Sequence, residues 1–305
     1  MPPWRYFSIL IALQLTFVQF SLTYTIDDSL PFTKMVEKIP IAEYFKNATV
    51  YHPLYESMAK GTLPEGTYKA LIQQDHLYID NFLDAFSILA KREEDPERKK
   101  YLQGVAEEDY DAYWQGFYDK LNVTKAVHMV PPVLEYCVFE LTAAKRADIA
   151  VALATFYPAY IVWIEMGHHI APIANLANNT NHPYFDFVSS TVEFAISTPT
   201  LKFLTVVNEY YARLGNDTKT KQQMLHAYTR SVQYQFKFAE AIFSMTEVES
   251  VPAPKFTELV DPWIAPDAQQ RVVNHALYTE IGVGNLPLDR FAILTQQGHL
   301  FMKGF

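Results

Sequence analysis

The chain has 305 residues and a net charge of −9, and its basic residues form no stripe, which argues against nucleic-acid binding. It contains 20 tyrosines and 21 phenylalanines, a content that suits a ring-rich core or a pocket for a flat ligand. The single cysteine, Cys137, leaves no partner for an internal disulfide, so the fold must rely on its hydrophobic core.

Residues 1–24 are predicted to be a signal peptide. Arg5 gives a basic start, residues 7–22 form a nearly uncharged apolar run, and residues 21–23 offer a small-residue cleavage site. The run is short for a membrane span, although an uncleaved anchor is the alternative. No other stretch reads as long and apolar enough to span, so no membrane contact is expected after signal cleavage.

Four Asn-x-Ser/Thr sequons follow the signal segment. One such tripeptide is uninformative, but four in loops or helix ends behind a signal peptide predict a secreted, extracellular glycoprotein. The acceptor asparagines are Asn47, Asn122, Asn178 and Asn216.

The hydrophobic pattern is helical almost throughout, with only ten glycines and no sustained β-type alternation. Proline at Pro64 predicts the start of a helix that runs to about Lys91. A second helix is predicted from Asp95–Pro96 to about Leu121.

Further helices are predicted to begin at Pro131, Asp148, Pro183, Pro199 and Thr218. The helix from Asp148 is expected to be interrupted near Pro158 and to end around His168–His169. The helix from Thr218 is expected to reach about Met245. Helices of this length joined by short loops predict an all-α bundle.

Residues 52–82 and 275–305 align without a gap, and roughly 12 of 31 positions are identical, which indicates an internal repeat. The sequence thus predicts a helical domain at 28–246, a linker and repeat start at 247–273, and a partial second copy at 274–305. In that copy Gly298 and Phe301 replace Asp75 and Tyr78. The residues that recur are expected to serve the fold, and they include His52, Leu63, Pro64, Gln73 and Gln74.

Several motifs occur together in a fixed order. A His52-Pro53 pair precedes a Gly61-Thr-Leu-Pro turn and a Gln74-Asp75-x-x-Tyr78 helix, and the segments 158–167 and 231–236 follow. Over about residues 30–246 this arrangement resembles the TenA/thiaminase II family. The resemblance implies a haem-oxygenase-like helical bundle that handles aminopyrimidines derived from thiamine.

The resemblance also implies roles for individual side chains. Asp75 matches the aspartate that holds the aminopyrimidine, since a carboxylate accepts hydrogen bonds from its amidine-like edge. Rings that sandwich the ligand are matched by Tyr78, Phe82, Tyr136 and Trp163. The alternatives are an Asp75 that only caps or pairs within the bundle, and rings that only fill the core.

The reactive positions depart from the family pattern. Ala159 stands where the family has its nucleophilic cysteine, and Gln233 stands where it has a glutamate acid/base. Family-type catalysis is therefore expected to be lost, which leaves a weak or inactive enzyme. Glu140, four residues after Tyr136, is a candidate for a displaced acid or base, or else a paired helix carboxylate. Cys137 is interpreted as an inert thiol, with a relocated nucleophile as the alternative.

The sequence therefore predicts a secreted protein that binds or acts on a thiamine-derived aminopyrimidine, or a non-catalytic carrier or interaction module. A homo-oligomer is compatible with the family resemblance. No cofactor is expected. Glu165 with His168–His169 lacks metal-site spacing, so no metal is expected, and the recurring His76 is interpreted as a packed residue rather than a haem ligand.

Overall fold

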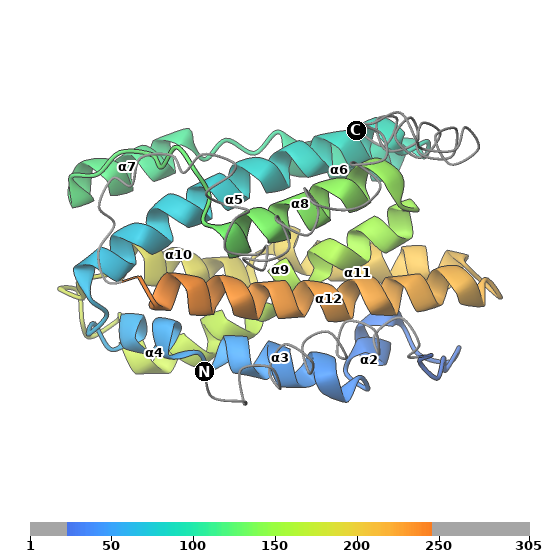
Figure 1. Ribbon diagram of the computed structural model, residues 1–305, viewed down its shortest axis with the longest axis horizontal. Coiled ribbons are helices and arrows are strands. Elements are labelled where there is room, and N and C mark those ends of the chain that lie inside the picture. Colours follow the sequence, from blue (N-terminus) through green and yellow to red (C-terminus); the bar gives the residue numbers. More distant parts are fainter. Residues whose placement is uncertain (1–22, 246–305) are drawn as a thin grey trace, which may run out of the picture. The chain divides into compact units, whose positions relative to one another are not determined.

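The computed structural model describes residues 23–245, and every helix or strand assigned within that range is an α-helix (Figure 1), which confirms the all-α prediction. In chain order the helices are α2 (Phe32–Val36), α3 (Pro40–Val50), α4 (Pro53–Ala59), α5 (Glu65–Arg92), α6 (Pro96–Ala106), α7 (Asp111–Leu121), α8 (Pro131–Arg146), α9 (Ile149–Ala174), α10 (Phe185–Ile196), α11 (Thr198–Arg213) and α12 (Thr218–Phe243).

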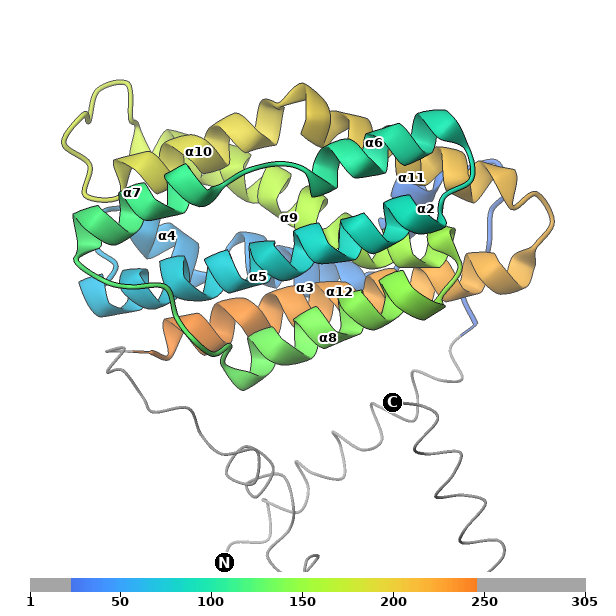
Figure 2. The ribbon, with the colours of Figure 1, turned by 90° about the horizontal axis from the view of Figure 1, so that it is seen from above.

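Helix α9 lies at the centre of the bundle and packs against α3, α4, α8, α10, α11 and α12. In Figure 1, α12 crosses the front, with α3 and α4 below it and α5 and α8 above it. Figure 2, turned by 90°, shows α6, α7 and α10 along the side of the bundle that lies opposite α12 and α8. The described helices thus enclose a core to which α5, α9 and α10 bring residues from distant parts of the sequence.

The extent of α9 corrects the prediction that this helix is interrupted near Pro158 and ends around His168–His169. The helix continues through Pro158 and ends only at Ala174, where Asn175 adopts a left-handed conformation with φ of 46°. Proline loosens the preceding turn of a helix. In that turn the carbonyl of Thr155 accepts a hydrogen bond of 2.6 Å from Ser231 of α12. Packing against α12 therefore supports the helix across the proline.

The second correction concerns membrane-spanning length. The sequence was predicted to hold no second stretch long and apolar enough to span a membrane. Helix α9 is such a stretch by length and composition, with a mean hydropathy of 1.6. However, 72% of that apolar window is buried inside the structure. Its composition is that of a central core helix, which a soluble bundle also requires.

The single helix predicted for residues 95–121 is two helices. Helix α6 ends at Ala106 and α7 begins at Asp111. Between them the side chain of Asp109 accepts a hydrogen bond of 2.9 Å from the backbone N–H of Asp111. Such a local side-chain bond competes with helix continuation. The acidic run at 107–109 therefore lies in the loop between α6 and α7, beside the cavity described below.

The predicted linker and second copy at 247–305 lie outside the described residues, as do residues 1–22 of the predicted signal peptide. Tyr24, the last residue of that predicted segment, is described. Its backbone N–H donates to Gln222 at 2.9 Å, and its hydroxyl donates to Thr229 at 3.1 Å. Tyr24 is therefore bound to α12.

Candidate functional site

A cavity of about 450 Å³ lies among α5, α7, α9 and α10, with the α6–α7 loop and the start of α11 at its border. Five of the side chains singled out from the sequence line it. They are Asp75, Tyr78 and Phe82 from α5, and Ala159 and Trp163 from α9.

Asp75 is the only one of these five that carries a charge. Asp75 is 7% exposed. Its carboxyl group forms no hydrogen bond or ion pair with any other residue in the 23–245 range. Burial raises the pKa of this carboxyl to about 7. A buried carboxylate is costly unless something donates hydrogen bonds to it, so Asp75 is suited to a ligand that carries N–H donors.

Tyr78 connects the cavity to a second buried carboxyl group. Its ring stacks on Tyr136 with centroids 5.2 Å apart, and its hydroxyl donates to Oε1 of Glu140 at 3.0 Å. Glu140 is 0% exposed, and burial raises its pKa well above the ordinary value despite hydrogen bonds from Tyr136 and Tyr78. Burial therefore disfavours the charged form of Glu140.

Three residues predicted for the site do not line this cavity. Tyr136 and Glu140 lie on α8 behind Tyr78, and Gln233 is half-buried on α12. Instead Gln235, two residues further on, is buried and donates to the Tyr136 hydroxyl at 3.0 Å. The Ser231 hydroxyl also donates to the Tyr136 hydroxyl, at 3.2 Å. Gln235 follows Ser231 by four residues, a spacing that places both on one helix face and that the sequence already contained.

The cavity also has aromatic walls that the sequence interpretation missed. Phe187 of α10 lines it. Tyr113 lines it from α7, and its hydroxyl is 2.8 Å from that of Ser190. Phe187 precedes Ser190 and Thr191 by three and four residues, so helical spacing places these side chains on one face. Further rings in the wall belong to Tyr110, Trp114, Tyr160 and Phe194.

No lining residue in the described part of the chain carries a thiol. Ala159 contributes a methyl group to the wall, and Cys137 lies elsewhere, buried on α8. Burial raises the pKa of the Cys137 thiol far above its ordinary value. Because the thiolate is the nucleophile, a thiol in this setting is unreactive at neutral pH. The structure thus supports the interpretation of Cys137 as an inert side chain.

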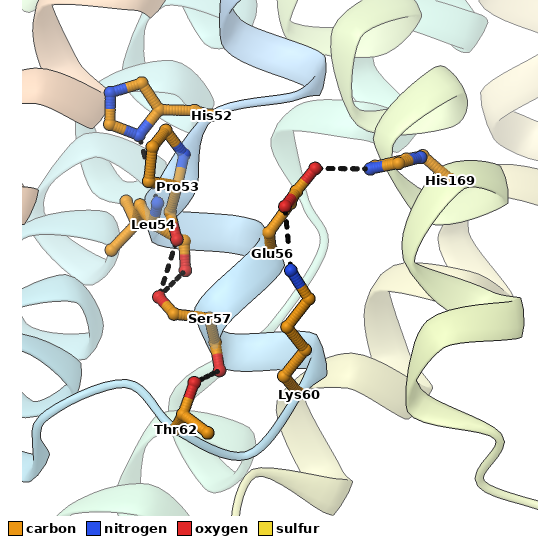
Figure 3. A network of polar contacts seen from close by, with 8 residues as sticks. All are labelled: His52, Pro53, Leu54, Glu56, Ser57, Lys60, Thr62 and His169. Carbon is orange, nitrogen blue, oxygen red and sulfur yellow. Dashed lines mark hydrogen bonds and ion pairs between the residues drawn. The ribbon is translucent and has the colours of Figure 1, made fainter.

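Three of the residues that recur in the sequence, His52, Gln73 and Gln74, form hydrogen bonds within the bundle. The Nδ1 atom of His52 accepts the N–H of Leu54 at 3.1 Å at the start of α4 (Figure 3). The amide groups of Gln73 and Gln74 donate to backbone carbonyls in the 122–130 segment at 2.6 and 3.0 Å. These bonds hold the connection between α7 and α8 against α5.

The histidines are not brought together as metal ligands within residues 23–245. His169 contacts Glu56 at 3.4 Å (Figure 3), whereas Glu165 pairs with Lys46 at 2.8 Å. His76 stacks on the ring of Trp114 at 5.0 Å with an interplanar angle of 8°. This is the packed arrangement that was expected for His76.

Comparisons with known proteins agree with this fold. The TENA/THI-4/PQQC family model matches residues 40–198 of the chain. The fold is similar to that of a TenA homologue from P. horikoshii, with a TM-score of 0.61 and 16% identity over 70% of this chain and 99% of that one. A protein assigned as a TenA-like thiaminase from Sulfolobus solfataricus gives a TM-score of 0.55 and 16% identity over 70% and 96%.

A TenA family transcription regulator from Silicibacter gives a TM-score of 0.59 and 16% identity, again over 70% of this chain and 96% of its own. At such identities the likeness establishes the fold rather than the activity. No curated protein sequence matches the chain.

Proposed function

The chain belongs to the TENA/THI-4/PQQC family, and from this premise we propose that its cavity binds a thiamine-derived aminopyrimidine. The observation that carries the proposal is Asp75, a buried carboxylate that faces the cavity without a hydrogen-bond partner in the described chain. The amino group and a protonated ring nitrogen of an aminopyrimidine supply two adjacent donors, which match the two oxygens of a carboxylate.

The ring walls support the same ligand class. Tyr78 and Phe82 on α5 face the cavity together with Trp163 on α9 and Phe187 on α10. Aromatic walls bind a flat heterocycle by stacking at a low cost in side-chain entropy. The volume of about 450 Å³ is in the range of small-molecule sites.

Binding, rather than cysteine chemistry, is the activity we assign to this site. Ala159 cannot act as a nucleophile, and an amide on α12 cannot exchange a proton as a carboxylate does. The second candidate is a hydrolase in which Glu140 exchanges protons with the cavity. The 3.0 Å bond from Tyr78 to Glu140 favours it, because Tyr78 touches both the cavity and that acid.

Isothermal titration calorimetry with 4-amino-5-hydroxymethyl-2-methylpyrimidine tests the proposed function. The wild type is expected to bind, and Asp75→Asn is expected to lose about tenfold or more, since a hydrogen bond to a charged group contributes about 1.5–3 kcal/mol. Asp84→Asn is the matched control, because Asp84 is exposed on the same helix. Equal affinity for wild type and Asp75→Asn would contradict the role of Asp75, and no binding by the wild type would favour the interaction module.

The hydrolase candidate needs a separate measurement. Release of product from thiamine and from an N-substituted aminopyrimidine is followed by chromatography for the wild type and Glu140→Gln. Turnover that is lost in Glu140→Gln while ligand affinity is retained assigns chemistry to Glu140. Turnover that is absent from the wild type leaves a binding protein.

We further propose that the protein is secreted and glycosylated. In support, the four acceptor asparagines Asn47, Asn122, Asn178 and Asn216 are all exposed. Expression of the full chain in a secreting eukaryotic cell, followed by glycosidase digestion and mass spectrometry, is expected to give protein in the medium with up to four removable glycans. Protein that stays inside the cell without glycans would contradict this.

A further inference from the structure

The cavity wall has an unusual balance of charge and aromatic area. Of its twenty lining residues, nine are aromatic and three are carboxylates, namely Asp75, Glu108 and Glu193. Among those lining residues, all of them in the described chain, there is no lysine, arginine or histidine. The wall therefore offers negative charge, ring faces and neutral hydroxyl groups, but no positively charged side chain.

The three carboxylates occupy different depths. Asp75 is buried, whereas Glu108, in the loop between α6 and α7, and Glu193, on α10, are exposed. The Tyr110 hydroxyl donates a hydrogen bond to Glu108, and the Ser189 hydroxyl donates one of 3.2 Å to Glu193. Glu108 and Glu193 thus lie where the cavity meets solvent, each held by a neighbouring hydroxyl. We call this pair the acidic mouth.

A wall of this kind discriminates between ligands by charge. Ring faces attract cations through their quadrupoles, an effect that grows as the cation leaves water. Carboxylates at the mouth add Coulomb attraction, which is modest because solvent screens it. A phosphate ester carries nearly two negative charges and normally needs arginine, lysine or a helix N-terminus to hold it. The start of α11 borders the cavity, but Pro199 has no N–H there and the N–H of Thr200 already donates to Oγ of Ser197 at 3.3 Å.

We infer that the acidic mouth, Glu108 and Glu193, makes this site select aminopyrimidines that carry a permanently cationic substituent and reject their phosphate esters. The inference rests on the proposed function and adds to it the charge of the ligand and two specificity-determining residues. Asp75 binds the pyrimidine edge, and the second, cationic part of the ligand lies between the rings and the acidic mouth.

Three ligands that share one aminopyrimidine ring test the inference by calorimetry on the full chain. Thiamine carries a fixed positive charge, the hydroxymethyl pyrimidine is neutral, and its monophosphate is anionic. The wild type is expected to bind thiamine about tenfold more tightly than the neutral ligand, and to bind the monophosphate at least tenfold more weakly.

The variant Glu108→Gln/Glu193→Gln removes both charges and retains the shape of the side chains. It is expected to reduce the preference for thiamine over the neutral ligand to about threefold, because affinity for thiamine should fall more than affinity for the neutral ligand. Glu94→Gln/Glu97→Gln makes the same change in net charge at exposed positions that do not line the cavity, and is expected to keep the wild-type preference. The wild-type preference should also weaken as salt is raised.

The outcomes separate the two proposals. Neutral-ligand binding that depends on Asp75, without any preference for the cation or rejection of the phosphate, overturns the charge inference and leaves the proposed function standing. A preference that survives intact in Glu108→Gln/Glu193→Gln overturns the role of the acidic mouth. Absence of binding for all three ligands contradicts the proposed function and this inference with it.

Discussion

The Tyr78 hydroxyl donates a hydrogen bond of 3.0 Å to Oε1 of Glu140, and this bond joins the cavity to a carboxyl group that solvent does not reach. Tyr78 lines the cavity, whereas Glu140 lies behind it on α8. Any influence of Glu140 on a ligand therefore passes through the Tyr78 hydroxyl or through the position of its ring. The bond gives a partner to the Tyr78 hydroxyl and to Oε1 of Glu140, whereas Oε2 of Glu140 is buried without a hydrogen-bond partner in the described residues.

Removal of the hydroxyl in Tyr78→Phe is expected to lower the free energy of unfolding by about 1–2 kcal/mol, because Glu140 loses a buried donor while the stacking on Tyr136 persists. Urea denaturation measures this. Tyr44→Phe, on an exposed ring, is the matched control and should change stability by less than about 0.5 kcal/mol. If both variants behave alike, the buried bond contributes nothing measurable.

A second prediction concerns Asp75 and pH. Its pKa of about 7 in the folded protein lies above the ordinary value of 3.8, so between these values the folded state binds more protons than the unfolded state. The free energy of unfolding is therefore expected to fall as pH rises from about 4 to about 7. Asp75→Asn removes this cost and should be more stable than the wild type above pH 7, on the order of 2–4 kcal/mol.

The measurement is urea denaturation of wild type, Asp75→Asn and Asp84→Asn at pH 5 and pH 8. The advantage of Asp75→Asn should grow with pH, and Asp84→Asn should follow the wild type. A side chain that stabilises the free protein by capping or pairing would give the opposite sign. Destabilisation by Asp75→Asn at both pH values would therefore establish the structural alternative for this carboxylate.

Local spacing made part of the site predictable. Asp75, Tyr78 and Phe82 recur at helical spacing on α5, so one helix face had to present all three together, and the structure places all three in one cavity wall. The prediction of the TenA/thiaminase II family from the motifs around them is confirmed by the family match over residues 40–198.

Contacts between distant helices were not predictable in the same way. Whether Tyr136 reaches the cavity or stacks behind Tyr78 depends on how α8 is rotated against α5, which no local pattern specifies. The choice between Gln233 and Gln235 depends likewise on the rotation of α12. Helix α9 continues through Pro158 with a bond from Ser231 to Thr155, a tertiary effect that overrides the local preference.

Gly167 gives a prediction about how α9 and α10 approach each other. A Cβ at this position would lie 2.8 Å from Cβ of Ala195 and 2.9 Å from the carbonyl oxygen of Thr191. Gly167→Ala is expected to lower the free energy of unfolding by about 1–3 kcal/mol, because backbone atoms of α10 must move. Since Thr191 lines the cavity, ligand affinity should fall as well.

Gly116→Ala is the matched control for this change. Gly116 lies inside α7, and a Cβ there would meet nothing within 4 Å. Alanine should therefore raise stability by about 0.5–1 kcal/mol through helix propensity alone. Thermal denaturation of both variants is expected to give shifts of opposite sign. A gain in stability for Gly167→Ala would show that α9 and α10 pack less closely than this geometry requires.

The last prediction concerns a thiol placed where the family has its nucleophile. Ala159 lines the cavity, so Ala159→Cys should present a thiol that a small alkylating agent reaches in the folded protein. Cys137, whose pKa is raised by burial, should stay unlabelled until the protein unfolds. Mass spectrometry after iodoacetamide treatment counts the labels: none for the native wild type and one for Ala159→Cys.

Protection by a ligand makes this measurement specific for the cavity. A saturating aminopyrimidine should slow labelling of Ala159→Cys, because it fills the space between Asp75 and Trp163 that the reagent must enter. Adding Asp75→Asn should raise the ligand concentration needed for that protection by about tenfold or more, without changing the labelling rate in the absence of ligand. Labelling of Cys137 in the native wild type, or an Ala159→Cys thiol that reacts only after denaturation, would contradict the assignment of position 159 to the cavity wall.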